Sequence, residues 1–548
     1  MRAHSQNIMT ILKSVKHDGM YRNRWLIIKC MFGTLAVAAV LSPSSIRAAE
    51  PQQARAAPEV FYGPVPKPHC RPSDRVETGL DGQLTLAERA SGASLKDYSC
   101  NLEVVGQFIG EGADHQLAWQ DDCAYFSTAG DTTGSNIPPM QFPGVQVIDV
   151  SDPRKPVRTD NLHDPSMMQP WESLQVNHTR KLLAGVEASH GLGRSPGFSI
   201  YDVSNCSHPR LLSSVTLPDP TISGHAGNFS VDGNTFYGTT IGVFNGFTLG
   251  VSLYAIDIKD PTKPSLIVNW KFPDGQAGLP HYITPNADGT LGYLGQLGDV
   301  STPGKLVRSN GLVIADLSDI QFRRPNPEVR VVSKLFWQDS MVSEVPLPLT
   351  IGGNPFILIT DELGAGGEVA REGAACAAKL PPFGFPRLID VRDVKNPKIV
   401  AKLMLEADDP NNCALTINDN PNEDTYGYSA HDCGVDNPND AKLVACSYHT
   451  AGIRVFDIHD PYHPKEIAYY KGAARGSGAI LPGSALNAKK MPAYSWAQAR
   501  SRFVWKGEDL YLWMTSSESG LVVAKFTNMD YIRRLHPTPD PGNQENNN

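Results

Sequence analysis

Short apolar runs recur along the chain, and each ends in an aspartate that begins a polar turn, usually closed by proline. Equivalent positions lie 53 to 74 residues apart. Runs of this length predict β-strands, and this spacing suits four short strands with their loops, the unit of a propeller blade. The copies read VQVIDVSDPRKP from Val145, FSIYDVSNCSHP from Phe198, LYAIDIKDPTKP from Leu253, LVIADLSDIQFRRP from Leu312, RLIDVRDVKNP from Arg387, IRVFDIHDPYHP from Ile453 and a degenerate LVVAKFTNMD from Leu521.

Tight turns join two further short strands between successive copies. Their tips carry Asp232-Gly233, Asp288-Gly289 and Gly352-Gly353, and such pairs between apolar runs are strong hairpin signals. One more strand follows each aspartate turn, as in EIAYYKG from Glu466. Each repeat therefore predicts an antiparallel sheet of four strands, labelled A to D from the centre outward.

The start and the end of the repeat region complement each other. The sequence NLEVVGQF (101–108) predicts a D strand ahead of the first A strand, whereas no clear D strand follows LVVAKF. We expect the N-terminal strand to complete the last blade, which closes the ring and removes its sheet edges. The predicted fold is all-β, a seven-bladed β-propeller over residues 99–530, with an N-terminal extension (50–98) and a flexible tail (531–548).

The repeated DVSDPxxP signature resembles that of the LVIVD-repeat family, and the similarity covers roughly residues 100–530. The resemblance implies a seven-bladed β-propeller but no particular activity.

A long apolar run from Trp25 to Leu41 follows Arg22 and Arg24 and leads into small residues that end at Ala49. These features predict a secretory signal peptide over residues 1–49. A membrane anchor is the alternative, but the run is shorter than the ~20 residues of a membrane span. We expect a periplasmic or secreted protein that has no membrane partner once the signal is removed.

Eight cysteines lie outside the signal, and an even number in an oxidising compartment favours disulfides. The absence of CxxC spacing argues against a thiolate zinc site and a thioredoxin-type motif. Cys433 and Cys446 flank the turn-like Asn-Pro-Asn-Asp at 437–440 and are placed to bridge a hairpin. The other pairings stay open.

Charge and composition limit the classes of partner that the chain is expected to bind. The chain has 548 residues, of which 41% are hydrophobic, and a formal net charge of −8. It has no Lys/Arg block after the signal, so nucleic acid is excluded as a partner. The sequence also lacks GxSxG, HExxH and GxxxxGK[ST], which removes the usual hydrolase, zincin and nucleotide motifs. The partner class that remains is a small-molecule substrate.

Histidine and glutamate recur where the innermost strands begin. These strand starts are expected at one end of the central channel. Four of the 15 histidines of the chain occupy such places, far more than chance gives. Converging imidazoles can bind a transition metal, and nearby carboxylates can orient the rings. The predicted ligands are His115, His225, His281 and His431, and the predicted orienting carboxylates are Glu172 and Glu344. In blade seven, the equivalent position at the start of the innermost strand lies near Trp496 or Gln498.

This pattern is similar to that of carotenoid cleavage oxygenases, which are seven-bladed propellers with a non-haem ferrous ion held by four histidines and supported by glutamates. By that analogy His115, His225, His281 and His431 are the ligands of one metal ion, while Glu172 and Glu344 support them. Two departures stand beside the similarity: the repeat is of the LVIVD kind, and a third supporting glutamate is not identifiable. In an oxidising compartment, copper competes with Fe(II).

The B–C loops belong to the same end of the channel, and several are long and rich in glycine and proline, as substrate entrances commonly are. The residues expected on this loop face are Glu187, His190, Glu362, His449 and Glu518.

The sequence favours an exported metal-dependent oxidoreductase that acts on a small organic substrate at the propeller axis, with iron or copper as cofactor. Two alternatives stay open. One is a non-catalytic exported propeller that binds a protein or a glycan. The other is a metal-assisted hydrolase or lactonase with carboxylates among the metal ligands.

Overall fold

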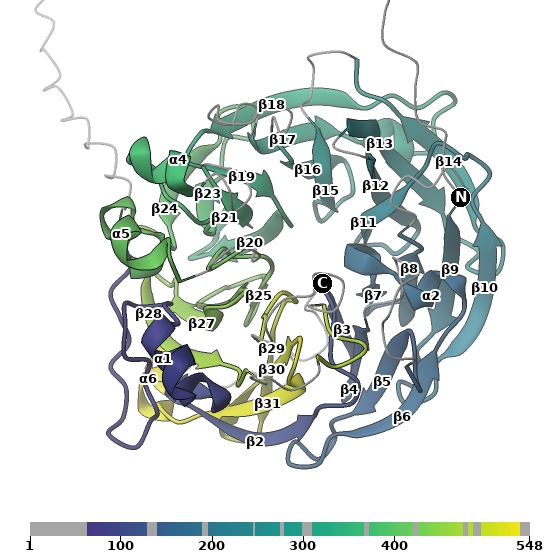
Figure 1. Cartoon of the computed structure of the whole chain (residues 1–548). Helices are drawn as coiled ribbons and strands as arrows, with labels where there is room; N and C mark the ends of the chain where they lie inside the picture. The colour runs from purple at the N-terminus through teal and green to yellow at the C-terminus, as the bar shows by residue number, and fades with distance from the viewer. Residues whose placement is uncertain are drawn as a thin grey trace, which may run out of the picture. The chain divides into compact units, whose positions relative to one another are not determined.

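The computed structural model describes residues 63–128, 140–188, 196–244, 247–273, 279–298, 310–365, 372–419, 426–474, 480–485 and 495–537, all within one compact unit that spans residues 57–548. The expected signal peptide lies outside these residues. Seven antiparallel sheets follow one another around a ring (Figure 1). This arrangement confirms the predicted seven-bladed β-propeller.

The first four blades each contain four consecutive strands in the order A to D. Blade one has β3 (Leu117–Gln120), β4 (Cys123–Ser127), β5 (Val145–Asp149) and β6 (Val157–Leu162), and blade two has β7 (Gln175–Asn177), β8 (Leu182–Val186), β9 (Gly197–Asp202) and β10 (Arg210–Thr216). Blade three has β11 (Gly224–Phe229), β12 (Thr235–Phe244), β13 (Phe247–Asp257) and β14 (Ser265–Trp270). Blade four has β15 (Pro280–Pro285), β16 (Leu291–Gln296), β17 (Asn310–Asp316) and β18 (Arg330–Trp337).

The last three blades carry additions to this plan. Blade five has β20 (Leu347–Ile351), β21 (Asn354–Ile359), β23 (Arg387–Asp390) and β24 (Lys398–Lys402), and a separate ladder of β19 (Ser340–Ser343) with β22 (Asp361–Gly364) adjoins it in sequence. Blade six has β25 (Cys433–Val435), β26 (Leu443–Tyr448), β27 (Gly452–Asp457) and β28 (Lys465–Lys471), with β1 (Tyr98–Cys100) paired outside β28. Blade seven has β29 (Arg502–Lys506), β30 (Asp509–Ser516) and β31 (Gly520–Phe526).

The ring closes through the N-terminal strand β2 (Leu102–Phe108). It pairs antiparallel with β31, with Leu102 opposite Phe526 and Phe108 opposite Leu521. The predicted closure is therefore confirmed, and this edge of blade seven is paired rather than left open.

The repeated aspartate at the end of each C strand has a local structural role. In six blades its Oδ1 accepts a hydrogen bond from the backbone N–H two residues later, at 2.8 to 3.1 Å. Such Asx turns redirect the chain into the D strand. At the A–B hairpin tips, Gly233 and Gly289 have φ angles of +65° and +72°, a conformation that favours glycine.

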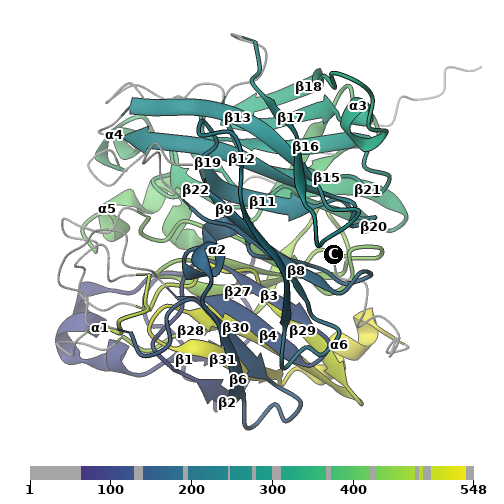
Figure 2. The same ribbon diagram turned by 90° about the vertical axis from the view of Figure 1, so that its right-hand side faces the viewer.

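Short helices lie on the two faces of the ring. In the side view of Figure 2, α4 (Glu372–Ala377) and α5 (Cys413–Thr416) lie on one face, while α3 (Ser318–Gln321) and α6 (Met529–Leu535) lie on the opposite face. Helix α6 corrects part of the expected flexible tail, because Ile532 is fully buried against blade seven. The remaining helices are α1 (Leu86–Ser91) and α2 (Pro165–Met168). Among the described residues, no helix combines the length and apolar character that crossing a membrane requires.

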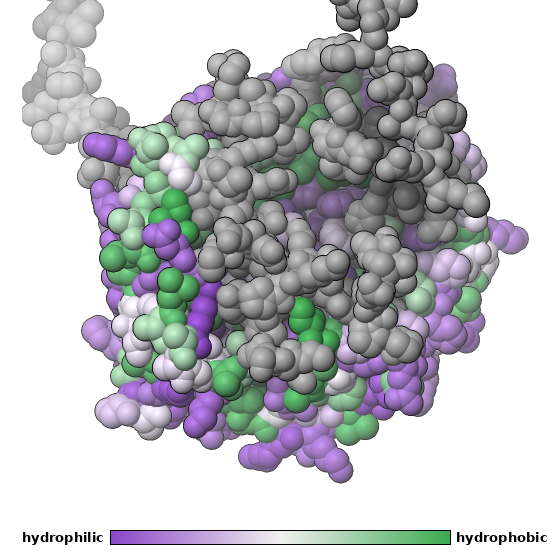
Figure 3. All heavy atoms as spheres, in the orientation of Figure 1, coloured by the Kyte–Doolittle hydropathy of each residue, from purple (hydrophilic) through white to green (hydrophobic). Residues whose placement is uncertain are grey.

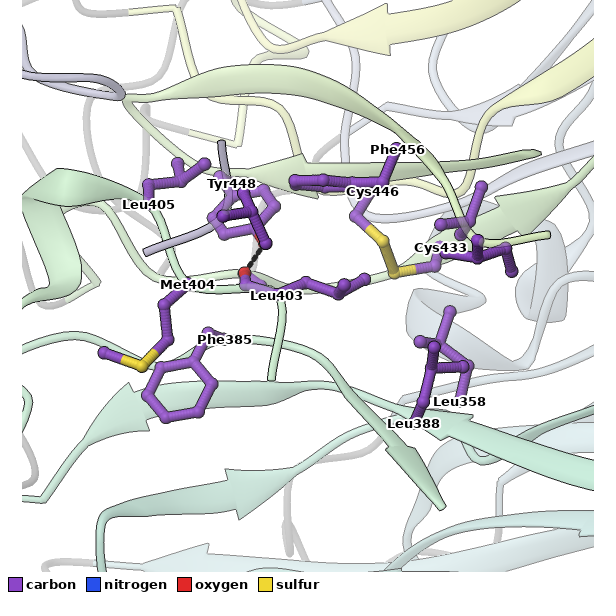
Figure 4. Packing of buried hydrophobic residues seen from close by; sticks show 14 of the residues in the cluster. Leu358, Phe385, Leu388, Leu403, Met404, Leu405, Cys433, Cys446, Tyr448 and Phe456 are labelled. Atoms are coloured by element: carbon purple, nitrogen blue, oxygen red, sulfur yellow. Dashed lines mark hydrogen bonds between the residues drawn. A yellow bond between two sulfur atoms is a disulfide. The ribbon is translucent and has the colours of Figure 1, made fainter. Parts of the chain in front are cut away.

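Hydrophobic side chains pack between neighbouring blades. Between blades five and six, Leu358 and Leu388 lie across from the Cys433–Cys446 disulfide, and the Tyr448 hydroxyl donates a hydrogen bond to the Leu403 carbonyl (Figure 4). By contrast, hydrophilic residues predominate along the lower and right-hand outer edge of the ring in Figure 3, whereas the left-hand side is mixed.

All eight predicted cysteines pair. The expected Cys433–Cys446 bridge is confirmed, and the bridges that the sequence left open are Cys70–Cys100, Cys123–Cys206 and Cys376–Cys413. Cys123–Cys206 joins blades one and two, and Cys70–Cys100 ties the N-terminal extension to β1.

The extension is also held to blade six by a buried charge cluster, defined here as the extension cluster. The Arg454 guanidinium lies 2.9 Å from Glu77, 3.2 Å from Asp81 and 3.3 Å from Glu466. The Lys471 ammonium lies 2.8 Å from Glu77. These buried carboxylates thus contact cations of the chain itself.

Candidate metal centre on the propeller axis

Residues at the starts of the innermost strands gather at one end of the central channel. His225 is the second residue of β11, and His281 is the second residue of β15. His115 and His431 each lie two residues before an innermost strand, β3 and β25. Glu172 lies in a 3₁₀ turn (Trp171–Ser173) ahead of β7. The up-and-down order of each blade brings these strand starts to the same end of the ring.

The Nε2 atoms of three histidines converge on the Glu172 carboxylate. His225 Nε2 lies 3.3 Å from it, His431 Nε2 3.5 Å and His281 Nε2 3.8 Å. The Nε2 atoms of His225 and His281 are 3.0 Å apart. His115 joins Glu172 and His431 in a group whose ligand atoms all lie within 4.8 Å of one another. All four histidines predicted from the sequence therefore surround one carboxylate.

The other ring nitrogen of three of these histidines faces an acceptor. His115 Nδ1 lies 2.5 Å from Asp114, His431 Nδ1 lies 3.0 Å from the Gln498 carbonyl, and His281 Nδ1 lies 3.2 Å from the Ser343 carbonyl. An acceptor at Nδ1 favours a proton there, which leaves Nε2 as the nitrogen that faces the centre. This is the arrangement found around histidines that bind metals.

Glu172 has a more central place than the sequence indicated. We expected it to orient histidines from behind, as Glu344 does, since Glu344 Oε1 lies 3.2 Å from His281 Nδ1. Instead, the Glu172 carboxylate lies among the Nε2 atoms. The 3₁₀ turn, in which Trp171 has a φ of +48°, brings this side chain into the ring, and no spacing rule reveals such a turn.

A second acidic group adjoins His431. Glu362, expected on the loop face, lies 3.6 Å from His431 Nε2 and is buried, and Glu344 joins the two in a group with ligand atoms within 4.8 Å. Among the described residues, ion pairs of Glu172, Glu344 and Glu362 involve histidines alone. We call these three carboxylates, with the four histidines, the axial cluster.

Burial and mutual contact shift the pKa values of this cluster in opposite directions. Burial acts to raise the pKa of Glu172, but the neighbouring histidines, His225 foremost, hold it well below its ordinary value. Burial raises the pKa of Glu344 well above its ordinary value, and the Glu172 charge adds to the effect. Burial lowers the pKa of His281 to about 3. In His431 burial is outweighed by Glu172 and Glu362, and the pKa rises to about 9.

Several polar atoms of the cluster lie near a charged partner but make no hydrogen bond of good geometry among the described residues. They include Nε2 of the fully buried His431, Oε2 of Glu172 and both carboxylate oxygens of Glu344. Leaving such groups unpaired in a buried site is costly. A cation at the centre would contact the inward-facing His431 and Glu172 atoms, so the donor set fits a transition-metal ion.

Aromatic side chains border the cluster. The Trp171 ring stacks on His115 with centroids 3.9 Å apart. Near His431, the ring of His449 stacks on Tyr426 at 4.6 Å and meets Trp496 edge-on at 5.3 Å. These rings place flat apolar surfaces beside the cluster.

The remaining loop-face residues are dispersed. His449 lies 5.5 Å from His431 between ring centroids, with its Nδ1 2.7 Å from the Ser429 carbonyl. Glu187 accepts a hydrogen bond from the Gly197 N–H, and Glu518 contacts the Leu481 N–H. His190 lies outside the described residues. The structure thus brings Glu362 and His449 close to His431, while Glu187 and Glu518 contact backbone N–H groups.

Sequence reasoning missed three groups that position the histidines. Asp114 precedes His115 directly, and its carboxylate was a recognisable signal. The carbonyls of Ser343 and Gln498 carry no side-chain signal, although Gln498 was one of two residues considered for blade seven.

The chain matches no protein-family model and no curated protein sequence, so the LVIVD-repeat likeness remains a resemblance. Among solved structures it is similar to a hypothetical selenium-binding protein from Sulfolobus tokodaii, with 12% identity, a TM-score of 0.46 and coverage of 73% of this chain and 84% of that chain. It is also similar to Kuenenia stuttgartiensis hydrazine synthase, with 12% identity, a TM-score of 0.44 and coverage of 77% and 96%. A third similar structure is a putative 6-phosphogluconolactonase from Bacteroides uniformis, with 12% identity, a TM-score of 0.40 and coverage of 74% of this chain and 96% of that chain.

Proposed function

We propose that the chain is an exported metal-dependent oxidoreductase that holds one iron(II) or copper ion within its axial cluster. The observation that carries the proposal is the 3.0 Å separation of the His225 and His281 Nε2 atoms beside Glu172. Two nitrogens bound to one ion at about 2.1 Å and at right angles lie about 3.0 Å apart. His115, His225, His281, His431 and Glu172 would hold the ion.

The donor set indicates the chemistry. Neutral imidazoles suit iron and copper, and a bound ion of either kind would supply redox chemistry with dioxygen. The chain's own groups then have defined tasks. The Nδ1 acceptors orient the histidines, and Glu344 and Glu362 can each hold a proton beside the centre because burial raises the pKa of both. Trp171, Tyr426 and Trp496 would exclude water and favour a small organic substrate with an aromatic or alkene part.

Export is part of the same proposal. The signal-like segment 1–49 and the four disulfides support a periplasmic or secreted location.

One observation favours a second candidate, a metal-assisted hydrolase or lactonase. The Glu172 carboxylate lies among the histidine Nε2 atoms, and a carboxylate in the ligand set is common in metal sites that activate water. Dioxygen uptake by the metal-loaded protein distinguishes the first candidate, and metal-dependent opening of simple lactones distinguishes the second.

Elemental analysis tests the proposal. The purified mature protein is expected to contain about one iron or copper ion per chain, and His431→Ala should lose it while the protein stays folded by circular dichroism. His463→Ala is the matched control, because His463 is 77% exposed on an outer turn and should leave the metal in place. Metal-free wild-type protein that also fails to bind added iron or copper would favour the non-catalytic binding alternative.

A further inference from the structure

A cavity occupies the central channel beyond the axial cluster, toward the A–B turns. Its volume is about 490 Å³, within the range of pockets that bind small molecules. The innermost strands of blades one to five form its wall, and its rim includes turn residues such as Thr179, Ala287 and Asn439. It therefore lies at the opposite end of the channel from the strand starts that carry the histidines.

A polar layer separates this cavity from the axial cluster. The Arg500 guanidinium donates from Nη2 to Gln175 Oε1 at 2.9 Å, and Gln175 Nε2 donates to the Tyr282 hydroxyl at 2.8 Å. The Tyr282 hydroxyl donates to the Glu172 backbone carbonyl at 3.1 Å. Arg500 and Gln175 line the cavity, whereas Tyr282 and Asp432 follow the predicted ligands His281 and His431 in sequence. The described lining of the cavity includes no residue of the axial cluster.

The charge of the lining is one-sided. Its described residues include no aspartate and no glutamate, and Arg500 is the one guanidinium among them, although the chain as a whole is acidic. The charge of Arg500 is only partly compensated by other groups of the protein. Its Nε lies 3.5 Å from Asp432 Oδ2, and this buried nitrogen has no hydrogen-bond partner among the described residues. Arg500 thus brings a guanidinium to the inner end of the pocket, and a guanidinium suits a carboxylate ligand.

Apolar side chains form much of the remaining wall. They come from four different blades, so they surround the channel rather than cover one side. An apolar ligand body would gain hydrophobic contact here, while the carboxylate reaches the inner end. These residues are Trp119, Val176, Phe229, Val345 and Leu347.

We propose that this cavity is a second binding site, distinct from the axial cluster, for a small organic carboxylate with an aromatic or branched apolar body. Arg500 binds the carboxylate, and the apolar wall holds the body. The proposal does not depend on a metal ion, because the polar layer lies between the two sites.

Isothermal titration of the whole folded protein with benzoate tests the proposal, with neutral benzyl alcohol as the matched ligand. Benzoate is expected to bind with a millimolar or lower dissociation constant, and benzyl alcohol at least tenfold more weakly. Arg500→Gln should weaken benzoate binding at least tenfold. Ala287→Trp is the second variant, because Ala287 is exposed at the rim, so a large side chain there narrows the mouth without disturbing the core.

The same titration on chelator-treated protein and on His225→Ala separates this site from the proposed metal centre. Unchanged benzoate binding in both supports the second site whatever the metal analysis shows. The proposal is overturned if wild-type protein binds no benzoate at about 10 mM, if both variants bind as wild type does, or if binding disappears with the metal.

Discussion

The extension cluster and the axial cluster both bury several carboxylates, but they balance them differently. In the extension cluster, Glu77, Asp81 and Glu466 contact Arg454, and Lys471 adds a second cation. In the axial cluster, the described ion pairs of Glu172, Glu344 and Glu362 involve histidines alone. Buried carboxylates need a charge partner. The first cluster therefore has cations of the chain among its partners, as a structural clamp needs, whereas the second has histidines as its described charge partners, which supports the proposed metal site.

Removing the cation of the extension cluster should have the largest effect on stability. Arg454→Met leaves three buried carboxylates without their main partner, and such losses cost about 3–5 kcal/mol. Chemical denaturation should show this loss, with the metal content of the folded protein unchanged. Arg392→Met is the control, since its pair with Asp390 is on the surface and should be worth about 1 kcal/mol or less. Equal effects of the two substitutions would contradict the clamp.

Removing a histidine from the axial cluster should instead reduce metal binding and leave stability nearly unchanged. His281→Ala and His225→Ala are each expected to weaken metal binding by more than the ~10–100-fold that is typical when a residue that only orients a metal ligand is replaced. The stability of the metal-free protein should change little, because the hydrophobic core lies between the blades. Competition with a chelator of known affinity measures the first effect, and thermal melting measures the second. Full metal affinity in both variants would remove these residues from the ligand set.

Much of this comparison could be predicted from the sequence, and the rest could not for identifiable reasons. The Asp-turn repeat and the Asp-Gly hairpins are local signals, so the seven blades and the closing strand followed from them. His115, His225, His281 and His431 were found because they share one place in the repeat. Glu172 was found but misplaced, because its 3₁₀ turn is set by packing. The extension cluster was missed, since Glu77 and Arg454 are far apart in sequence and meet only when the extension folds onto blade six.

Replacing a carboxylate that supports a histidine should have an intermediate effect on metal affinity. Glu344→Gln keeps the size of a side chain whose pKa burial raises well above its ordinary value, so the metal-free protein should be as stable as wild type or slightly more stable. Metal affinity or activity should fall about 10–100-fold. A destabilised protein with unchanged metal affinity would instead assign Glu344 to the fold.

The last expected effect is a change in the pH dependence of stability, and it comes from the extension cluster. Burial, with the Glu77 charge, raises the pKa of Asp81 to about 6 despite Arg454. Because the folded state then binds more protons than the unfolded state between about pH 4 and 6, this residue's contribution to stability falls as pH rises through that range. Asp81→Asn should remove that slope and stabilise the protein by about 1–3 kcal/mol at pH 7. Denaturation midpoints across this pH range measure it, and an unchanged slope would argue against Asp81 as its source.

Anomalous X-ray diffraction at the iron and copper absorption edges tests the central claim most directly. Crystals of the metal-loaded protein are expected to show one strong peak on the propeller axis, about 2.1 Å from the Nε2 atoms of His115, His225, His281 and His431 and beside the Glu172 carboxylate, and none in the extension cluster. Loaded crystals without a peak at the axial cluster, or with a peak held by other residues, would contradict the account.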